Sequence, residues 1–167
     1  MITAKEIIAL LKLQRHPKEG GYFRETYRSK DLLSDLPARY RGQRAAGTAI
    51  YYLLTPTSFS AMHRVASDEG FHFYTGGPVE MLQLHPDGHG EIVILGNDLR
   101  AGQSPQIIVP AGVWQGSRLA SSGEFALLGT TVAPGFDYAD YESGERDWLV
   151  QRYPDFAEMI RELTANT

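Results

Sequence analysis

The sequence contains no cysteine, so disulfide bonds and thiolate chemistry are excluded. It has no run of 18 apolar residues that could span a membrane, and no amino-terminal secretory signal in which a basic segment precedes an apolar one. No cluster of lysine and arginine offers the basic footprint that nucleic-acid phosphates require, and the net charge is −4. These absences predict a cytoplasmic protein whose partners include neither nucleic acid nor membrane.

The composition is that of an ordinary globular protein. The 167 residues are 43% hydrophobic and 22% charged, which allows a folded core and argues against disorder. There is no internal repeat, linker or low-complexity tract. Residues 1–167 are therefore expected to form a single domain.

Helices are expected only near the two ends of the chain. Thr3 and Glu6 match a capping box, and the apolar residues after them have helical spacing until the turn at Pro17. At the other end, Pro154 suits a first helical turn. An apolar stripe with helical spacing follows it, formed by Phe156, Met159, Ile160 and Leu163.

Between these helices the sequence is typical of β-structure. Short runs of β-branched and aromatic residues alternate with turn sequences such as Gly76-Gly77-Pro78. The expected strands are residues 22–28, 48–54, 59–65, 71–74, 79–84, 91–95, 106–109 and 125–132. Residues 30–44 are expected to form a polar loop. Short strands at this spacing predict an all-β fold, a sandwich or a barrel.

Segment 63–76 concentrates groups that can carry chemistry inside this β-region. His63, Glu69 and His72 lie within ten residues, and buried polar groups cost free energy unless they are paired. Neutral imidazole can take a proton near pH 7, so His63 is the strongest candidate for a general base. Side chains alternate along a strand, so if Glu69 points inward, His72 and Tyr74 point outward. Only a β-bulge between Glu69 and His72 would bring that imidazole inside.

The sequence resembles the cupins, whose fold is a double-stranded β-helix or jelly-roll barrel. Their first motif, roughly G-x5-H-x-H-x3,4-E-x6-G, is matched in part by His63, Glu69 and Gly76. Their second motif, P-x-G-x2-H-x3-N, is matched by residues 110–115 with Gln115 at the histidine position. A closer similarity, to single-domain cupins described as predicted sugar epimerases, lies in the phrases HPKEGGYFRETYRS, SDEGFHFYTGGPVEMLQLHPDG, QIIVPAGVWQGS and TVAPGFDYADYE. The resemblance implies a barrel with helices packed outside it, and a homodimer, for which the aromatic segment 22–27 offers an edge strand.

The resemblance implies a metal site only in part. A metal-binding cupin is expected to present two histidines and a glutamate from the first motif and one histidine from the second, but Val65 and Gln115 occupy two of these positions. An amide oxygen is a poor ligand for metals that imidazole suits, and His63 with Glu69 falls short of the three protein ligands of a catalytic zinc site. We therefore expect no cofactor. The alternative is a divalent metal held by His63, Glu69, His72 and Gln115.

The resemblance also implies a chemistry, because metal-free cupin epimerases of nucleotide sugars use a histidine base and a tyrosine acid on opposite faces of a keto-sugar. His63 would be the base. The acid would be Tyr74 or one of Tyr51, Tyr52 and Tyr138, among which the sequence does not choose. We expect an epimerase or isomerase that acts on a carbohydrate-derived small molecule, with Glu69 also in the catalytic site. The alternatives are a barrel that binds a small ligand without catalysis and a metal-dependent enzyme.

Further side chains are candidates for substrate binding. Gln115 would line the mouth of the barrel, and His72 would join it if a bulge turned it inward. Arg24 could clamp a phosphate or a carboxylate through its planar guanidinium, or it could belong to a charged edge strand. Asp137 could orient the histidine base or cap a following helix. His16 lies in a turn beside a proline and is expected at the surface.

Overall fold

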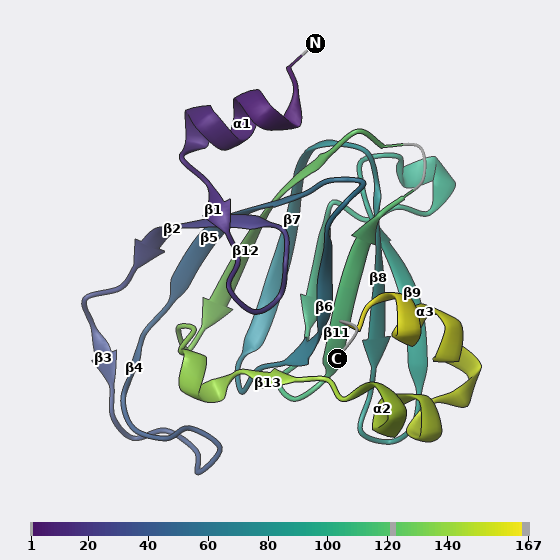
Figure 1. Cartoon of the computed structure of the whole chain (residues 1–167). Helices are drawn as coiled ribbons and strands as arrows, with labels where there is room; N and C mark the ends of the chain where they lie inside the picture. Colours follow the sequence, from purple (N-terminus) through teal and green to yellow (C-terminus); the bar gives the residue numbers. More distant parts are fainter. Residues whose placement is uncertain (1, 121–122, 165–167) are drawn as a thin grey trace.

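Strands form most of the regular structure. The computed structural model describes residues 2–120 and 123–164 (Figure 1). The strands are β1 (Gln14–Arg15), β2 (Tyr22–Arg28), β3 (Leu32–Leu33), β4 (Arg44–Ala45), β5 (Thr48–Leu54), β6 (Phe59–Arg64), β7 (Asp68–Gly76), β8 (Val79–Leu84), β9 (Gly90–Leu95), β10 (Gln106–Val109), β11 (Trp114–Leu119), β12 (Ala126–Ala133) and β13 (Glu142–Ser143). The helices are α1 (Ala4–Leu11), α2 (Arg146–Arg152) and α3 (Ala157–Glu162), with 3₁₀ turns η1 (Leu99–Ala101), η2 (Tyr138–Asp140) and η3 (Pro154–Phe156).

Two sheets of antiparallel strands form a jelly roll. One has the strand order β1-β2-β5-β12-β7-β10 and the other the order β13-β6-β11-β8-β9, while β3 and β4 form a separate ribbon. From β5 to β8, each strand lies in the opposite sheet from the one before it, as it does again from β9 to β13. This arrangement confirms the mainly-β jelly-roll prediction.

The interior between the sheets is apolar over much of its length. Its buried side chains come from strands of both sheets and include Tyr52, Leu54, Phe71, Val79, Met81, Leu95, Val109, Val113, Ala126 and Leu128. Side chains alternate between the two faces of a strand, so every second residue of β5, β7 and β12 contributes to this core. The same alternation places polar residues of these strands in the interior at one end of the barrel.

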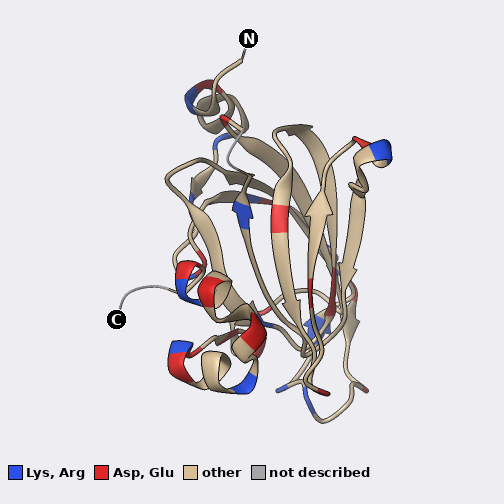
Figure 2. Cartoon of the chain, turned by 90° about the vertical axis from the view of Figure 1, so that its right-hand side faces the viewer, with Lys and Arg blue, Asp and Glu red and all other residues tan. Residues whose placement is uncertain are grey.

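The helices cover the outer faces of the sheets. Ile7 of α1 packs with Leu53 and Phe125 against the six-stranded sheet, and Thr3 and Glu6 form the predicted capping box. The apolar faces of α2 and α3 pack on the five-stranded sheet around Trp114. Charged residues gather on the helices and the connecting loops, and the strands carry few of them (Figure 2). Among the described helices, none has the length and apolar character needed to cross a bilayer.

The strand prediction was wrong in several places, which include the two-residue strands β1 and β13. β11 was not expected, although it lies at the centre of the five-stranded sheet between β6 and β8. Its sequence, WQGSRL, includes a glycine and no β-branched residue, so its pairing depends on tertiary contacts rather than on propensity. The loop expected at residues 30–44 contains β3 and the first residue of β4, which pair with each other.

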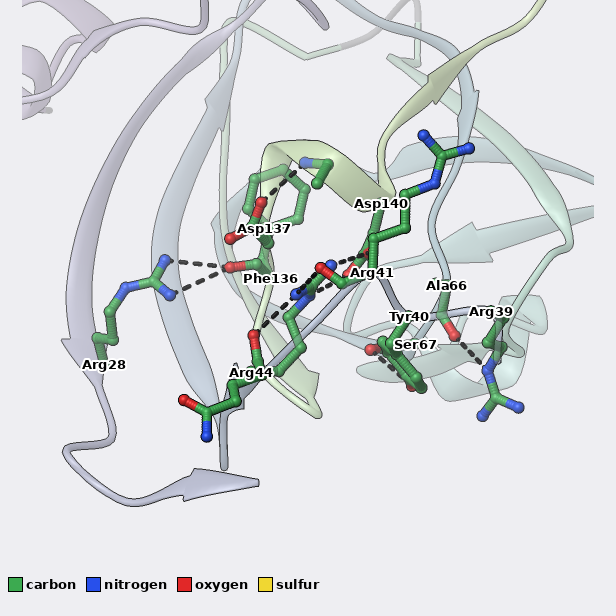
Figure 3. A network of polar contacts seen from close by, with 12 residues as sticks. Arg28, Arg39, Tyr40, Arg41, Arg44, Ala66, Ser67, Phe136, Asp137 and Asp140 are labelled. Carbon is green, nitrogen blue, oxygen red and sulfur yellow. Dashed lines mark hydrogen bonds and ion pairs between the residues drawn. The ribbon is translucent and has the colours of Figure 1, made fainter. Parts of the chain in front are cut away.

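Segment 134–142 runs from the end of β12 to β13 and is hydrogen-bonded to the strands beside it (Figure 3). Arg44 donates two hydrogen bonds to the carboxylate of Asp140, with N–O distances of 2.7 and 2.6 Å, and both side chains are only 4% exposed. The backbone N–H of Phe136 donates to the hydroxyl of Thr48 at 2.9 Å, and the Arg28 guanidinium donates to the Phe136 carbonyl at 3.2 Å. These contacts hold the segment over one end of the barrel.

Candidate functional site

A cavity of about 230 Å³ opens at the end of the barrel that segment 134–142 covers. Its walls come from β2, β5, β7 and β12, from segment 134–142, and from the turn at residues 16–21. The apolar lining consists mainly of Phe23, Ile50, Phe71, Val132 and Phe136. The polar lining includes His16, Glu19, Tyr52, Glu69 and Thr130. The cavity is therefore apolar on most sides, with titratable groups gathered in one part of it.

The turn at residues 16–21 carries Glu19 into this site. Gly20 and Gly21 have φ angles of +90° and +68°, which favour glycine, and a Cβ on Gly20 would lie 2.5 Å from the Phe59 carbonyl oxygen. The Tyr52 hydroxyl donates to the Gly20 carbonyl at 2.9 Å. The backbone N–H of Ala61 donates to the Glu19 carbonyl at 2.8 Å. The turn is thus held against both sheets, and Glu19 is fixed between them.

Glu19 lies between two imidazoles. Its Oε1 is 3.6 Å from Nε2 of His16 and 3.7 Å from Nε2 of His63. Nδ1 of His63 is 2.7 Å from the Ala61 carbonyl oxygen, which can only accept, so this nitrogen carries the proton and Nε2 presents a lone pair to Glu19. Nδ1 of His16 accepts the backbone N–H of Glu19 at 2.9 Å, so Nε2 of His16 carries the proton. One imidazole therefore offers a donor to the carboxyl group and the other offers an acceptor.

Burial favours the uncharged forms of Glu19, Glu69, His16 and His63. It raises the pKa of Glu19 to about 8, because the charged form is poorly solvated there. Burial and the neighbouring Glu19 both raise the pKa of Glu69. Burial lowers the pKa of His16 to about 4 and also lowers the pKa of His63. The site thus combines one protonated carboxylic acid, Glu19, with neutral imidazoles, which is a combination suited to moving protons at pH 7.

Glu69 is oriented by Gln115 of the opposite sheet. The Gln115 side-chain nitrogen donates to Oε2 of Glu69 at 2.7 Å. Gln115 also lies opposite His63 in the pairing of β11 with β6. The predicted residues His63, Glu69 and Gln115 are therefore brought together inside the barrel, although only Glu69 lines the cavity itself.

Asp137 also lines the cavity, at its mouth. Its side chain accepts the backbone N–H of Ala139 at 2.8 Å, so it caps the 3₁₀ turn η2 rather than a helix near Arg146. Within the residues that the structure describes, no hydrogen bond or ion pair joins it to His63, the histidine that it was expected to orient.

Three predicted site residues lie on the opposite face of the six-stranded sheet. His72 contacts the Thr131 hydroxyl at 3.0 Å there, as strand alternation predicted. Tyr74 is 48% exposed, and its ring packs against that of Tyr51, with centroids 6.1 Å apart. The Arg24 guanidinium lies over the Tyr51 ring, 5.6 Å from its centroid. None of the three lines the cavity, so the expected roles of His72 and Arg24 in binding and of Tyr74 as an acid do not match this geometry.

The residues expected to form a metal site do not form a ligand set. Val65 is buried and offers no donor atom, and His72 faces away from Glu69. In the described residues there is no group of three or more His, Cys, Asp or Glu side chains arranged to hold a metal ion. The donor atoms present therefore do not fit the metal alternative.

Sequence reasoning missed the two residues that complete the site. The prediction that His16 lies at the surface was wrong. The turn at residues 16–21 packs against both sheets, and the His16 side chain is buried there. Glu19 was not singled out at all. The signal that could have indicated it is the acidic residue directly before Gly20-Gly21, since a glycine pair often marks a close approach between backbones.

Comparison with known proteins gives the family. A family model described as cupin superfamily (DUF985) matches residues 5–144. The chain belongs to this cupin family. An uncharacterised relative, protein YML079W of Saccharomyces cerevisiae, is 32% identical over 149 residues, which cover 83% of this chain and 74% of the relative. The resemblance noted in the sequence to cupins as a superfamily is thus confirmed.

Solved structures of similar proteins have the same fold as this chain. A hypothetical protein from Leishmania major superposes on this cupin with a TM-score of 0.89, at 31% identity and with 99% of this chain and all of that chain covered. Protein SO0799 from Shewanella oneidensis gives a TM-score of 0.87 at 33% identity, with both chains covered completely. Oxalate decarboxylase from Bacillus subtilis shares the fold alone, with a TM-score of 0.56 at 14% identity over 94% of this chain and 38% of the decarboxylase.

Proposed function

We propose that this cupin is an acid–base enzyme that epimerises or isomerises a small carbohydrate-derived molecule by proton transfer next to a carbonyl group. The observation that carries the proposal is the partly buried Glu19, which faces the cavity with its carboxyl group between two neutral imidazoles. A carboxylic acid with a pKa of about 8 can both give and take a proton near neutral pH.

The geometry assigns different roles to Glu19 and His63. His63 does not line the cavity, and its Nε2 lone pair lies behind Glu19. His63 can accept the Glu19 proton, which leaves a carboxylate at the cavity to remove the proton next to the substrate carbonyl. Glu69 is held by Gln115 and its pKa is raised by burial, and in its protonated form it can donate a proton to the carbonyl oxygen. Glu19 then returns its proton to a carbon of the enol, Glu69 takes back a hydroxyl proton as the carbonyl group re-forms, and His63 returns its proton to Glu19. Protonation of the original carbon on its other face gives the epimer, protonation of the neighbouring carbon gives the isomer, and all three side chains recover their starting states.

The tyrosines are less suited to the acid role that was expected for one of them. Tyr51 and Tyr74 lie on the outer face of the sheet. Tyr52 lines the cavity, but its hydroxyl already donates to Gly20 and burial raises its pKa further. Tyr138 stands at the mouth of the cavity, with 42% of its surface exposed. A protonated glutamate therefore replaces tyrosine as the proposed acid.

Solvent-deuterium exchange tests this proposal against a barrel that only binds. Wild-type protein in D₂O with free ketohexoses and amino-hexoses is expected to place deuterium at the carbon beside the carbonyl of its substrate, detected by NMR. His63→Ala is expected to slow this exchange by about 10- to 100-fold, because Glu19 loses the acceptor for its proton while the cavity wall stays intact. The exposed His89→Ala serves as the matched control and is expected to leave exchange unchanged.

Melting temperature measured on the same variants separates chemistry from structure. Removing a buried hydrogen-bonding group costs about 1–3 kcal/mol of stability. A lower melting temperature of His63→Ala with unchanged exchange would assign this residue a structural role only. Ligand binding without exchange in the wild type would assign the barrel a binding function in place of catalysis.

A further inference from the structure

The cavity is small for a ligand site. Its volume is about 230 Å³, whereas pockets that bind drug-sized molecules have volumes of about 300 to 1,000 Å³. An apolar protein cavity of about 150 Å³ holds one benzene molecule, so this cavity has room for about ten non-hydrogen atoms. That is close to the size of a free monosaccharide or a small keto compound. A sugar nucleotide is several times larger.

The segment that closes this end of the barrel limits how far a larger ligand could extend. Phe136 and Tyr138 of segment 134–142 line the cavity, and their rings are in contact, with centroids 5.0 Å apart. The same segment is held by the buried ion pair of Asp140 with Arg44, in which both side chains are 4% exposed. A ligand that needs more room would have to displace this anchored wall.

No cation in the lining is available to an anionic ligand. Arg28 carries the one guanidinium among the described lining residues. It donates two hydrogen bonds to the Glu25 carboxylate, at 3.0 and 2.7 Å, and a further one to the Phe136 carbonyl. Lys18 is exposed and lies outside the lining. A phosphate or carboxylate inside the cavity would therefore lose its hydration without gaining a counter-ion, which costs free energy.

A cationic ligand meets no free counter-charge inside either. The Glu25 carboxylate is paired with Arg28. Glu19 has a pKa of about 8 and is protonated at neutral pH, and burial also raises the pKa of Glu69. Asp137 lies at the mouth, where its side chain accepts the Ala139 N–H. The wall is thus close to electrically neutral, and it favours neither sign of charge.

The lining also restricts where a ligand can be polar. Glu69 lies within interaction distance of Glu19 and Thr130, so these hydrogen-bonding groups are close together in the lining. Most of the remaining wall is apolar, with Phe23, Ile50, Phe71, Val132 and Phe136. A hydroxyl group against these side chains would lose its hydrogen bonds to water without replacement. A ligand that fits therefore carries its polar groups on one side and apolar carbons on the others.

We propose that the cavity binds an uncharged keto compound no larger than a free monosaccharide, with its oxygen atoms on one side, as in a deoxygenated keto-sugar. Phosphorylated sugars and sugar nucleotides are excluded by their charge and their size. This inference rests on the proposed function in taking the cavity as the substrate site. The selectivity concerns binding alone, so molecules that do not react can test it.

Three probes that share one ring and differ in charge test the selectivity. Benzyl alcohol, benzoate and benzylamine would be titrated into ¹³C-methyl-labelled protein, with binding followed through the methyl resonances of Ile50 and Val132, which line the cavity. Benzyl alcohol is expected to bind with a dissociation constant in the millimolar range, at least about fivefold tighter than either charged probe. Equal or tighter binding of benzoate or benzylamine would overturn the proposal.

UDP-glucose tests the size limit in the same assay. At about 10 mM it is expected to leave the Ile50 and Val132 resonances unchanged, because the molecule exceeds the cavity. Saturable shifts of these resonances would contradict the limit on size and charge. Selective binding of benzyl alcohol without deuterium exchange in any keto compound would support this inference and contradict only the proposed reaction.

A variant that fills the cavity locates the binding. Val132 is 5% exposed, and Val132→Phe is expected to weaken benzyl alcohol binding at least about tenfold, because the larger ring takes up the space of the ligand. Ile108→Phe places the same ring on the exposed β10 and is expected to retain wild-type affinity. Unchanged affinity in a folded Val132→Phe protein would place the probe elsewhere and overturn the proposal. If Val132→Phe does not fold, the comparison of probes on wild-type protein decides the question.

Discussion

Glu19→Gln is expected to slow solvent-proton exchange into the substrate by about 100- to 10,000-fold, the usual cost of losing a general acid or base. The amide has nearly the same shape as the carboxylic acid but can neither take up nor release a proton at neutral pH. The effect should exceed that of His63→Ala, because Glu19 lines the cavity and His63 acts through it. The measurement is deuterium incorporation by NMR, compared at equal protein concentration with wild type and both single variants.

The control for this variant is Glu158→Gln, which makes the same chemical change on an exposed helix and is expected to retain wild-type exchange. Circular dichroism and melting temperature establish that Glu19→Gln is folded. Exchange within a few-fold of wild type in a folded Glu19→Gln protein would contradict the assigned role. Equal losses in Glu19→Gln and His63→Ala would instead show that the two residues act as one unit.

Glu19→Gln is also expected to change how stability depends on pH. Relative to wild type, the free energy of unfolding of the variant should rise by about 1.4 kcal/mol per pH unit between pH 4.5 and pH 8, or about 3 kcal/mol from pH 5.5 to 7.5. The reason is that the pKa of Glu19 is about 8 in the folded protein, against an ordinary value of 4.5. Chemical denaturation at a series of pH values measures this difference.

The sign of the effect follows from proton binding. Between pH 4.5 and about 8, the folded protein retains the Glu19 proton and the unfolded chain releases it. The stability that the protonated carboxyl group contributes is therefore complete below pH 4.5 and lost as the pH rises through 8. His16, with its pKa lowered to about 4, has the opposite effect between pH 4 and 6.5, but it is present in both proteins and cancels in the difference. A difference that stays constant with pH would contradict the raised pKa.

Local sequence patterns predicted most of the fold, because most strands are runs of β-forming residues that end at clear turn sequences. Strands 48–54, 79–84 and 106–109 have the predicted bounds, since each is a run of β-formers between clear turns. β11 escaped prediction because pairing with β6 and β8, rather than its own composition, makes it a strand. Alternation along β7 correctly placed Glu69 and Phe71 inside and His72 outside.

The site was harder to predict because it depends on contacts between distant parts of the chain. His63, Glu69 and Gln115 could be found from the motif, and they meet inside the barrel. Glu19 joins them only because its turn is clamped by hydrogen bonds from two strands, and no local pattern reports such contacts. The missing group was therefore the carboxyl group between the two imidazoles.

The central claim is that Glu19, which lies between His16 and His63, is a protonated carboxylic acid at neutral pH. A ¹³C NMR titration of the glutamate side-chain carboxyl groups tests it without a substrate, and the Glu19→Gln variant assigns the resonance. The account predicts that this resonance titrates with a midpoint near pH 8, above that of an ordinary glutamate at 4.5. A midpoint near 4.5 would show that Glu19 is charged at neutral pH, and it would contradict the proposed proton transfer.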